Sequence, residues 1–171
     1  MSEHVYHTIP PVYDSRSRVL ILGSMPSPKS RAAGFYYAHP QNRFWKTLAG
    51  VFGVPPFGSV SEKKEFCLRR GIALWDVIAE CDIVGASDAS VKNAVPNDFS
   101  RIMSECDIKA VFTTGRLAHD LLYKLCGLQS VCLPSPSAAN RAVSDERLLR
   151  EYTAIADVLN STETGGCGNV G

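Results

Sequence analysis

Residues 19–28 read Val-Leu-Ile-Leu-Gly-Ser-Met-Pro-Ser-Pro, a short apolar run that leads into a loop of proline and serine. About 110 residues later, residues 131–141 have a similar arrangement, with a short apolar run before a Pro/Ser loop: Val-Cys-Leu-Pro-Ser-Pro-Ser-Ala-Ala-Asn-Arg. Loops at the carboxyl ends of parallel strands converge on one crevice. We therefore predict that both loops form one site, together with the aromatic stretch 34–45. Such a site is rich in backbone N–H groups, small hydroxyls and aromatic rings, and poor in carboxylates and metal ligands.

The rest of the chain alternates between strand and helix patterns. Lys109–Thr113 is apolar and β-branched, which indicates a strand, and Leu117–Leu125 carries leucines at helical spacing before Gly127. Gln129–Leu133 is a further expected strand, and residues 79–97 show no periodicity, which predicts an irregular and often functional connection. The other expected helices are Asn42–Val51, Glu62–Arg70 capped by Ser61, Asp98–Glu105 capped by Asn97, and Asp145 to about Leu159 capped by Ser144. This alternation predicts a parallel sheet covered by helices.

Length and composition fit one globular domain. The chain has 171 residues, 45% of them hydrophobic, which is enough for a sizeable core. We expect the domain to span residues 1–159, and the Gly/Ser/Thr-rich residues 160–171 to be a disordered tail. The first twenty residues carry Pro10-Pro11, Asp14 and Arg16, so no signal peptide or membrane span is indicated. A soluble, cytoplasmic protein is the expectation.

The cysteines and the net charge exclude several classes of protein. The six cysteines form no Cys-x-x-Cys pair and have no histidine at metal-ligand spacing, which argues against a zinc site or a four-cysteine cluster. Reduced thiols are therefore expected. The formal net charge of +1 lacks the large positive excess of many nucleic-acid binders. Any contact with DNA must come from locally placed side chains.

In combination, these motifs resemble the uracil-DNA glycosylase superfamily. Residues 34–46, Gly-Phe-x-x-Ala-His-Pro-x-Asn-Arg-Phe-Trp-Lys, and residues 133–141, Leu-Pro-x-Pro-Ser-x-x-x-Arg, are most similar to the mismatch-specific uracil-DNA glycosylases. Residues 71–99 are more similar to the hypoxanthine-DNA glycosylases. The resemblance covers nearly all of Ile9–Leu159. It implies a three-layer α/β sandwich around a mainly parallel, four-stranded sheet.

The first loop departs from the mismatch-specific pattern at Met25. Those enzymes have an asparagine there that positions the attacking water, and a thioether cannot hold a water as a carboxamide does. The resemblance to the hypoxanthine-DNA glycosylases implies a different arrangement, in which the asparagine of His-Pro-x-Asn is catalytic. That residue is Asn42 here. A helix-capping role for Asn42 stays open, since asparagine is a good N-cap.

The resemblance also implies contacts to an extruded base. Tyr37 corresponds to the aromatic residue that stacks on the base, although aromatic residues also serve as core packing. His39 is either a general acid or, because it precedes a proline, a loop-fixing hydrogen bonder. Asp88 is either an assistant to Asn42 or the cap of a turn. The expected base-binding residues are Gly23, Ser24, Met25, Phe35, Tyr37, Ser87 and Asp88.

DNA contacts are expected from both loops. In the family, the second motif contacts flanking phosphates and fills the gap that the base leaves, and Arg141 is suited to replace the lost stacking. Ordinary solvated turns are the competing interpretation for both loops. The expected DNA-binding residues are Ser27, Lys29, Ser135, Ser137, Asn140 and Arg141.

Taken together, the resemblance implies a monomeric, monofunctional glycosylase without metal or cofactor. We expect it to remove hypoxanthine from double- or single-stranded DNA. The alternatives are a mismatch-type uracil or thymine glycosylase and a non-catalytic DNA-lesion-binding module. A Rossmann-type nucleotide enzyme is disfavoured, because the first loop offers only Gly23 where three glycines are needed. A cysteine hydrolase is disfavoured too, since no cysteine lies in a nucleophile-elbow context.

Overall fold

The computed structural model describes residues 1–167, with side chains described as far as Ser161. Four parallel strands form the central sheet in the order β3 (Ile72–Asp76), β2 (Val19–Gly23), β6 (Ala110–Thr114), β7 (Val131–Leu133). Strand β2 is buried along its whole length. Its side chains alternate between two cores, because successive residues of a strand point to opposite faces. The predicted α/β fold with a parallel, four-stranded sheet is confirmed.

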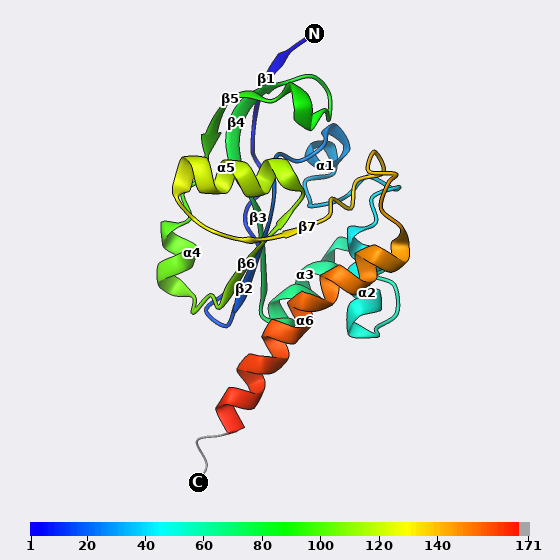
Figure 1. The fold of residues 1–171 in the computed structure, drawn as a ribbon, viewed down its shortest axis with the longest axis vertical. Coiled ribbons are helices and arrows are strands. Elements are labelled where there is room, and N and C mark those ends of the chain that lie inside the picture. Colours follow the sequence, from blue (N-terminus) through cyan, green and yellow to red (C-terminus); the bar gives the residue numbers. More distant parts are fainter. Residues whose placement is uncertain (168–171) are drawn as a thin grey trace.

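Helices cover both faces of this sheet, which completes the three layers (Figure 1). The helices α2 (Phe44–Phe52), α3 (Val60–Arg70) and α6 (Asp145–Cys167) contribute to the core on one face. The helices α4 (Ser100–Glu105) and α5 (Arg116–Cys126) contribute to the other core. The short helix α1 (Pro28–Ala33) follows β2 at the carboxyl edge of the sheet. The expected strand–helix alternation is confirmed for β6, α5 and β7.

A second, antiparallel sheet corrects the expectation of an irregular connection at 79–97. It consists of β1 (Glu3–Tyr6), β4 (Ile78–Ile83) and β5 (Lys92–Pro96), with the 3-10 turn η1 (Asp88–Ser90) between the last two. Strand β4 pairs with β1, more than seventy residues earlier in the chain. Its buried residues are Ile78, Cys81 and Ile83, which do not alternate strictly, so the two-residue period of a strand was not visible in the sequence.

Several element ends differ from the expected ones. The N-cap of α3 is Ser59, whose hydroxyl accepts the N–H of Glu62, and not Ser61. Asn97 does not cap α4, because its amide donates to the carbonyls of Asp76 and Ile78. Ser144 does lie at the start of α6, and its hydroxyl accepts the N–H of Arg147 at 3.1 Å.

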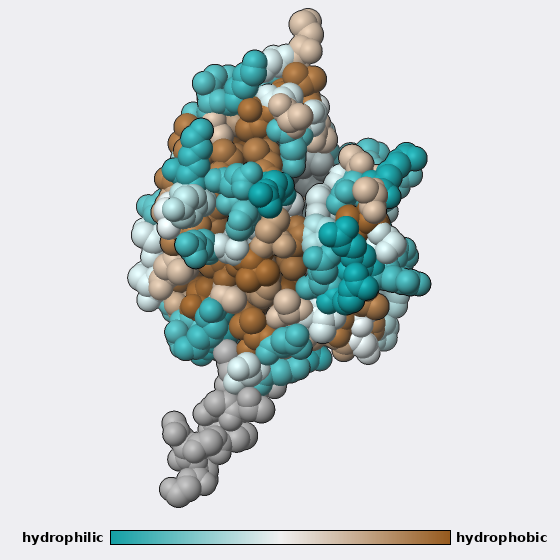
Figure 2. Space-filling model, viewed as in Figure 1, coloured by the Kyte–Doolittle hydropathy of each residue, from teal (hydrophilic) through white to brown (hydrophobic). Residues whose placement is uncertain are grey.

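Helix α6 runs from Asp145 to Cys167 and so includes residues 160–167, which were expected to belong to a disordered tail. The remainder of that expectation, residues 168–171, lies outside the described residues. No helix in the described part of the chain is both long enough and apolar enough to span a bilayer. On the face shown in Figure 2, apolar side chains gather between α5 and α6, around the edge strand β7, where Val131 is 48% exposed.

Candidate active site

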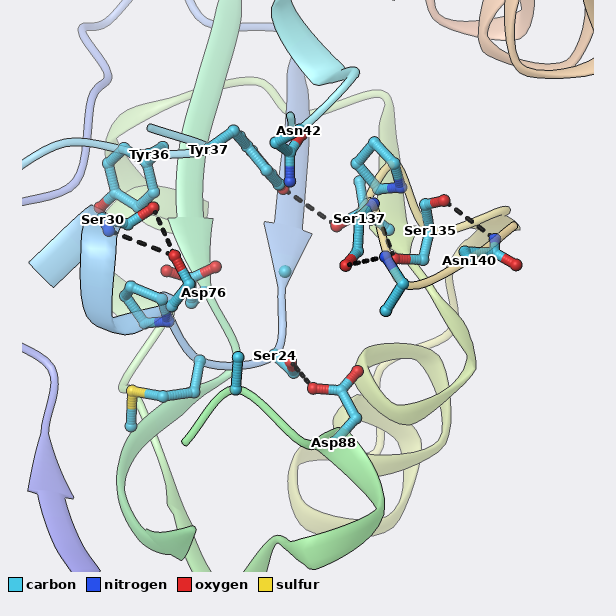
Figure 3. A pocket seen from close by; sticks show the side chains of 18 of the residues that line it. Ser24, Ser30, Tyr36, Tyr37, Asn42, Asp76, Asp88, Ser135, Ser137 and Asn140 are labelled. Atoms are coloured by element: carbon cyan, nitrogen blue, oxygen red, sulfur yellow. Dashed lines mark hydrogen bonds between the residues drawn. The ribbon is translucent and has the colours of Figure 1, made fainter. Parts of the chain in front are cut away.

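A cleft of about 410 Å³ lies at the carboxyl edge of the central sheet. Segments far apart in sequence line it: residues 23–27 after β2, residues 36–42, residues 86–88 beside η1, and residues 135–140 after β7. Asp76 and Thr114, at the ends of β3 and β6, complete the lining. In Figure 3, Tyr37 and Asn42 lie opposite Ser24 and Asp88, and Ser135, Ser137 and Asn140 form a third side. The two Pro/Ser loops therefore meet, as the parallel sheet predicts.

Most of the predicted site residues line this cleft. Lys29 and Arg141 are exposed and lie outside the lining. Phe35 is a correction: it is 5% exposed and its ring stacks on Trp45 at 5.8 Å, because the chain turns it into the core. A direct contact between Phe35 and a base is incompatible with this position. The predicted residues that line the cleft are Gly23, Ser24, Met25, Ser27, Tyr37, Asn42, Ser87, Asp88, Ser135, Ser137 and Asn140.

Tyr37 forms an aromatic wall of the cleft. Its ring stacks on Phe44, with 3.9 Å between the centroids and 17° between the planes, and its hydroxyl lies 3.0 Å from Oγ1 of Thr114. Its backbone has φ 53°, a left-handed conformation that is uncommon for a tyrosine. Burial raises the pKa of Tyr37, so its hydroxyl stays neutral. Tyr37 is one of the residues that line the cleft.

Asn42 has its two amide atoms in different environments. Its Oδ1 accepts the N–H of Phe44, the first residue of α2, at 2.9 Å, from the position before the N-cap residue Arg43. Its amide nitrogen points toward the cleft (Figure 3) and has no hydrogen-bond partner among the described residues. The capping contact fixes the side chain, and the NH₂ group is left to meet a ligand or a water molecule.

Two other sequence expectations concern His39 and Asp88. The Nδ1 of His39 accepts the N–H of Gln41 at 3.0 Å, so His39 fixes its own loop, and it does not line the cleft. Asp88 accepts a hydrogen bond from the hydroxyl of Ser24 at 3.0 Å. Desolvation raises the pKa of Asp88, and this hydrogen bond opposes the rise. The contact joins the loop after β2 to the turn η1 and does not involve Asn42.

The loop after β7 is held rigidly. Within it, the N–H groups of residues 137 and 139 are bound by the hydroxyls of Ser135 and Ser137, and Asn140 donates to the carbonyl of Ser135. The guanidinium of Arg43 donates to the carbonyls of Val143 and Asn140 at 2.7 and 2.9 Å. This role of Arg43 is not visible in the sequence, because its partners lie about 100 residues away.

Asp76 is the buried carboxylate of the cleft, and the sequence prediction missed it. It is 4% exposed, and its Oδ2 lies 2.7 Å from Nε2 of His7. The backbone N–H of Gly23 also donates to it, and a Cβ at position 23 would lie 2.6 Å from Oδ1, so only glycine allows this approach. Burial raises the pKa of Asp76, and His7 opposes the rise. An aspartate directly after the apolar run 72–75 was the available signal.

Metal ligands and activated thiols are not found among the described side chains. No group of three or more His, Cys, Asp or Glu side chains in that part of the chain could hold a metal ion. Burial raises the pKa of every described cysteine thiol, which disfavours a nucleophilic thiolate. The chemistry available in the cleft is therefore that of a carboxamide, a carboxylate, hydroxyls and backbone dipoles.

Comparison with known proteins gives a consistent result. The sequence matches the model of the uracil DNA glycosylase superfamily over residues 10–158. A protein of Methanosarcina acetivorans named hypoxanthine DNA glycosylase is 33% identical over 142 residues, which is 81% of this chain and 90% of the relative. A protein of Methanosarcina barkeri with the same name is 32% identical over 137 residues, 77% of this chain and 86% of the relative.

The fold agrees with a solved structure. The solution NMR structure of a protein from Methanosarcina acetivorans, described as a candidate uracil DNA glycosylase, superposes with a TM-score of 0.78 at 29% identity. The match covers 94% of this chain and 99% of the other. The family match over most of the chain, the two relatives and this common fold show that the chain belongs to the uracil-DNA glycosylase superfamily.

Proposed function

We propose that the protein is a monofunctional DNA glycosylase that removes hypoxanthine from DNA and leaves an abasic site. The observation that carries this proposal is the cleft of about 410 Å³, where the ring of Tyr37, the carboxamide of Asn42 and the carboxylate of Asp76 meet. The relatives named hypoxanthine DNA glycosylase support this choice of base.

The cleft suits a deaminated base that has left the DNA stack. The ring of Tyr37 offers stacking, and the buried carboxyl of Asp76 offers a hydrogen-bond acceptor. Hypoxanthine carries a proton on N1 where adenine has a lone pair, so a carboxylate binds the first and repels the second. Uracil offers the same contact through N3–H. That contact favours a second candidate function, a mismatch-type uracil or thymine glycosylase.

The reaction needs few side chains. As the glycosidic bond breaks, its electron pair leaves with the base, the sugar becomes oxocarbenium-like, and water adds to C1′. Met25 cannot orient that water, whereas the Asn42 amide, fixed by Phe44 and directed into the cleft, can. Backbone N–H groups of the loop after β2 stabilise the charge that develops on the base.

The two loops are placed to hold the DNA around the cleft. Extrusion of a base costs roughly a few kcal/mol, and less for a mispaired base such as inosine. In this proposal Ser27, Lys29 and the serines of the loop after β7 bind flanking phosphates. Arg141, exposed at the end of that loop, enters the gap that the base leaves.

The experiment compares three duplexes that carry deoxyinosine, deoxyuridine or a G·T mismatch. Abasic products are revealed by alkaline strand cleavage under single-turnover conditions. We expect deoxyinosine to be processed fastest. Equal or faster processing of deoxyuridine would select the mismatch-type candidate. A mobility shift on all three duplexes without strand cleavage would select a non-catalytic lesion-binding module.

A further inference from the structure

The pair formed by His7 and Asp76 is unusual among the ion pairs of the described residues. The two side chains are 2% and 5% exposed, whereas every other such pair has at least one partner that is more than 30% exposed. A buried ionisable pair is costly to form, so its presence at a cleft indicates a function. The mechanism above uses Asp76 but leaves His7 without a role.

His7 belongs to a different part of the fold from the rest of the cleft. It follows β1, and its backbone N–H donates to the carbonyl of Ala79 on β4 at 2.7 Å. Its ring lies 6.1 Å from the ring of Tyr36 and 6.4 Å from that of Trp75. These contacts hold the imidazole behind the cleft, which it does not itself line.

Among the described residues, the side chain that binds Asp76 by a hydrogen bond is His7. The groups that face it are the imidazole of His7, the N–H of Gly23, and the neutral hydroxyls of Tyr36 and Tyr37. Burial raises the pKa of the Asp76 carboxyl. Without His7, only the Gly23 N–H would oppose this rise, and the protonated form would be favoured. A protonated Asp76 presents an O–H group, which donates a hydrogen bond where the carboxylate accepts one.

We propose that His7 is the positioning residue for base selection: its Nε2–H keeps Asp76 a carboxylate, aimed to accept the ring N–H of a deaminated base. This inference rests on the proposed glycosylase function. An acceptor fits N1–H of hypoxanthine, whereas a donor would fit the lone pair on N1 of undamaged adenine. When two acceptors or two donors face each other in a site without water, both polar groups are left without a hydrogen bond. This is a strong basis for discrimination between hypoxanthine and adenine. His7 thus determines whether the cleft accepts a base with an N–H group or a base with a lone pair at this ring nitrogen.

The test is a double-mutant cycle measured as the single-turnover rate of hypoxanthine release at pH 7. His7→Leu removes the donor, and we expect the rate to fall about 10- to 100-fold. In an Asp76→Asn background the acceptor is a neutral amide that needs no partner to stay unprotonated, so His7→Leu should change the rate less than about twofold. His7→Gln keeps an N–H donor and should restore much of the rate. His4→Ala is the matched control, because the solvent-accessible His4–Asp82 pair, which joins β1 to β4, has the same 2.7 Å separation.

The pH profile distinguishes this role from a merely structural one. Loss of His7 raises the folded-state pKa of Asp76 further, so the acid limb of the rate should move to higher pH, and the His7→Leu defect should shrink towards pH 9. If His7→Leu does not fold, the same cycle is run with His7→Asn, whose shorter amide does not reach Asp76.

The outcomes separate the two proposals. A pH-independent loss that is equal in both backgrounds would overturn the inference while hypoxanthine release by the wild type still supported the glycosylase. An unchanged rate in His7→Leu would do the same. If the wild type released no base from any lesion, the proposed function would be wrong, and the role of His7 would fall with it.

Discussion

The Oδ1 atom of Asn42 accepts the backbone N–H of Phe44 at 2.9 Å, so one carboxamide both binds the first N–H of α2 and lies at the cleft. The first turn of α2 carries the stacked Phe44 that supports Tyr37, so capping and the aromatic wall of the cleft are connected. The capping and catalytic interpretations of Asn42 are therefore not exclusive, and suitable substitutions separate them.

Asn42→Ala should remove most base excision, because it removes the amide that we propose to orient the water. It should also cost about 0.5–2 kcal/mol of stability through the lost cap. Asn42→Ser is the matched variant, since serine caps as well as asparagine but has no amide group. We expect near-normal melting and an equally slow single-turnover rate. Wild-type excision by Asn42→Ser would leave Asn42 with the capping role alone.

Arg43→Ala should weaken DNA processing without touching the reacting groups. Arg43 donates two hydrogen bonds to backbone carbonyls of Asn140 and Val143, so its loss frees the loop after β7. We expect a lower melting temperature and a severalfold slower excision at subsaturating enzyme. Lys46→Ala is the control: Arg43 and Lys46 each pair with the Asp145 carboxylate at 3.2 Å, but Lys46 is exposed and does not contact the loop. Equal effects of both substitutions would argue against loop anchoring.

The substitutions Arg141→Ala and Lys29→Ala should impair DNA processing in different ways. A wedge matters most where opening the duplex costs most, so Arg141→Ala should slow excision from a well-paired lesion more than from a mispaired or single-stranded one. Lys29→Ala should weaken binding to all substrates alike and lower the slope of log affinity against log salt. The measurement is excision from paired, mispaired and single-stranded substrates, with binding titrated over salt. Equal losses for Arg141→Ala on every substrate would make it another phosphate contact.

Catalysis should not depend on a divalent metal ion. The reacting groups proposed above are a carboxamide, a carboxylate and backbone dipoles, which stabilise the leaving base directly. Excision should therefore be unchanged after dialysis against a chelator. Activity that is lost on chelation and restored by Mg²⁺ or Zn²⁺ would contradict this expectation.

The sequence predicted those parts of the molecule that local patterns determine. The apolar run of β2, the leucine spacing of α5 and the Pro/Ser loops located the central sheet and the edge where the cleft lies. Phe35 was misplaced because position in a loop-like aromatic stretch does not reveal which ring turns inward. Here Phe35 turns into the core and Tyr37 lines the cleft.

The features that escaped prediction depend on contacts between distant segments. The sheet of β1, β4 and β5 pairs residues 3–6 with residues 80–83. Asp76 meets His7 across 69 residues, and Arg43 meets Asn140 across 97. No short-range periodicity encodes such pairings, since each becomes favourable only after the central sheet has brought the segments together. The contacts that set the charge and position of side chains in the cleft are thus less visible in the sequence than the strands and loops that form the cleft.

The most direct test of the account is the identity of the product released from a duplex with a single deoxyinosine. The reaction is run with enzyme in excess, and the small-molecule fraction is analysed by mass spectrometry beside the alkali-treated strand. We predict free hypoxanthine, in amounts equal to the abasic strand, and much less of both products with Asn42→Ala. Release of deoxyinosine monophosphate, or an intact duplex after complete binding, would contradict the claim that this protein is a hypoxanthine-releasing DNA glycosylase.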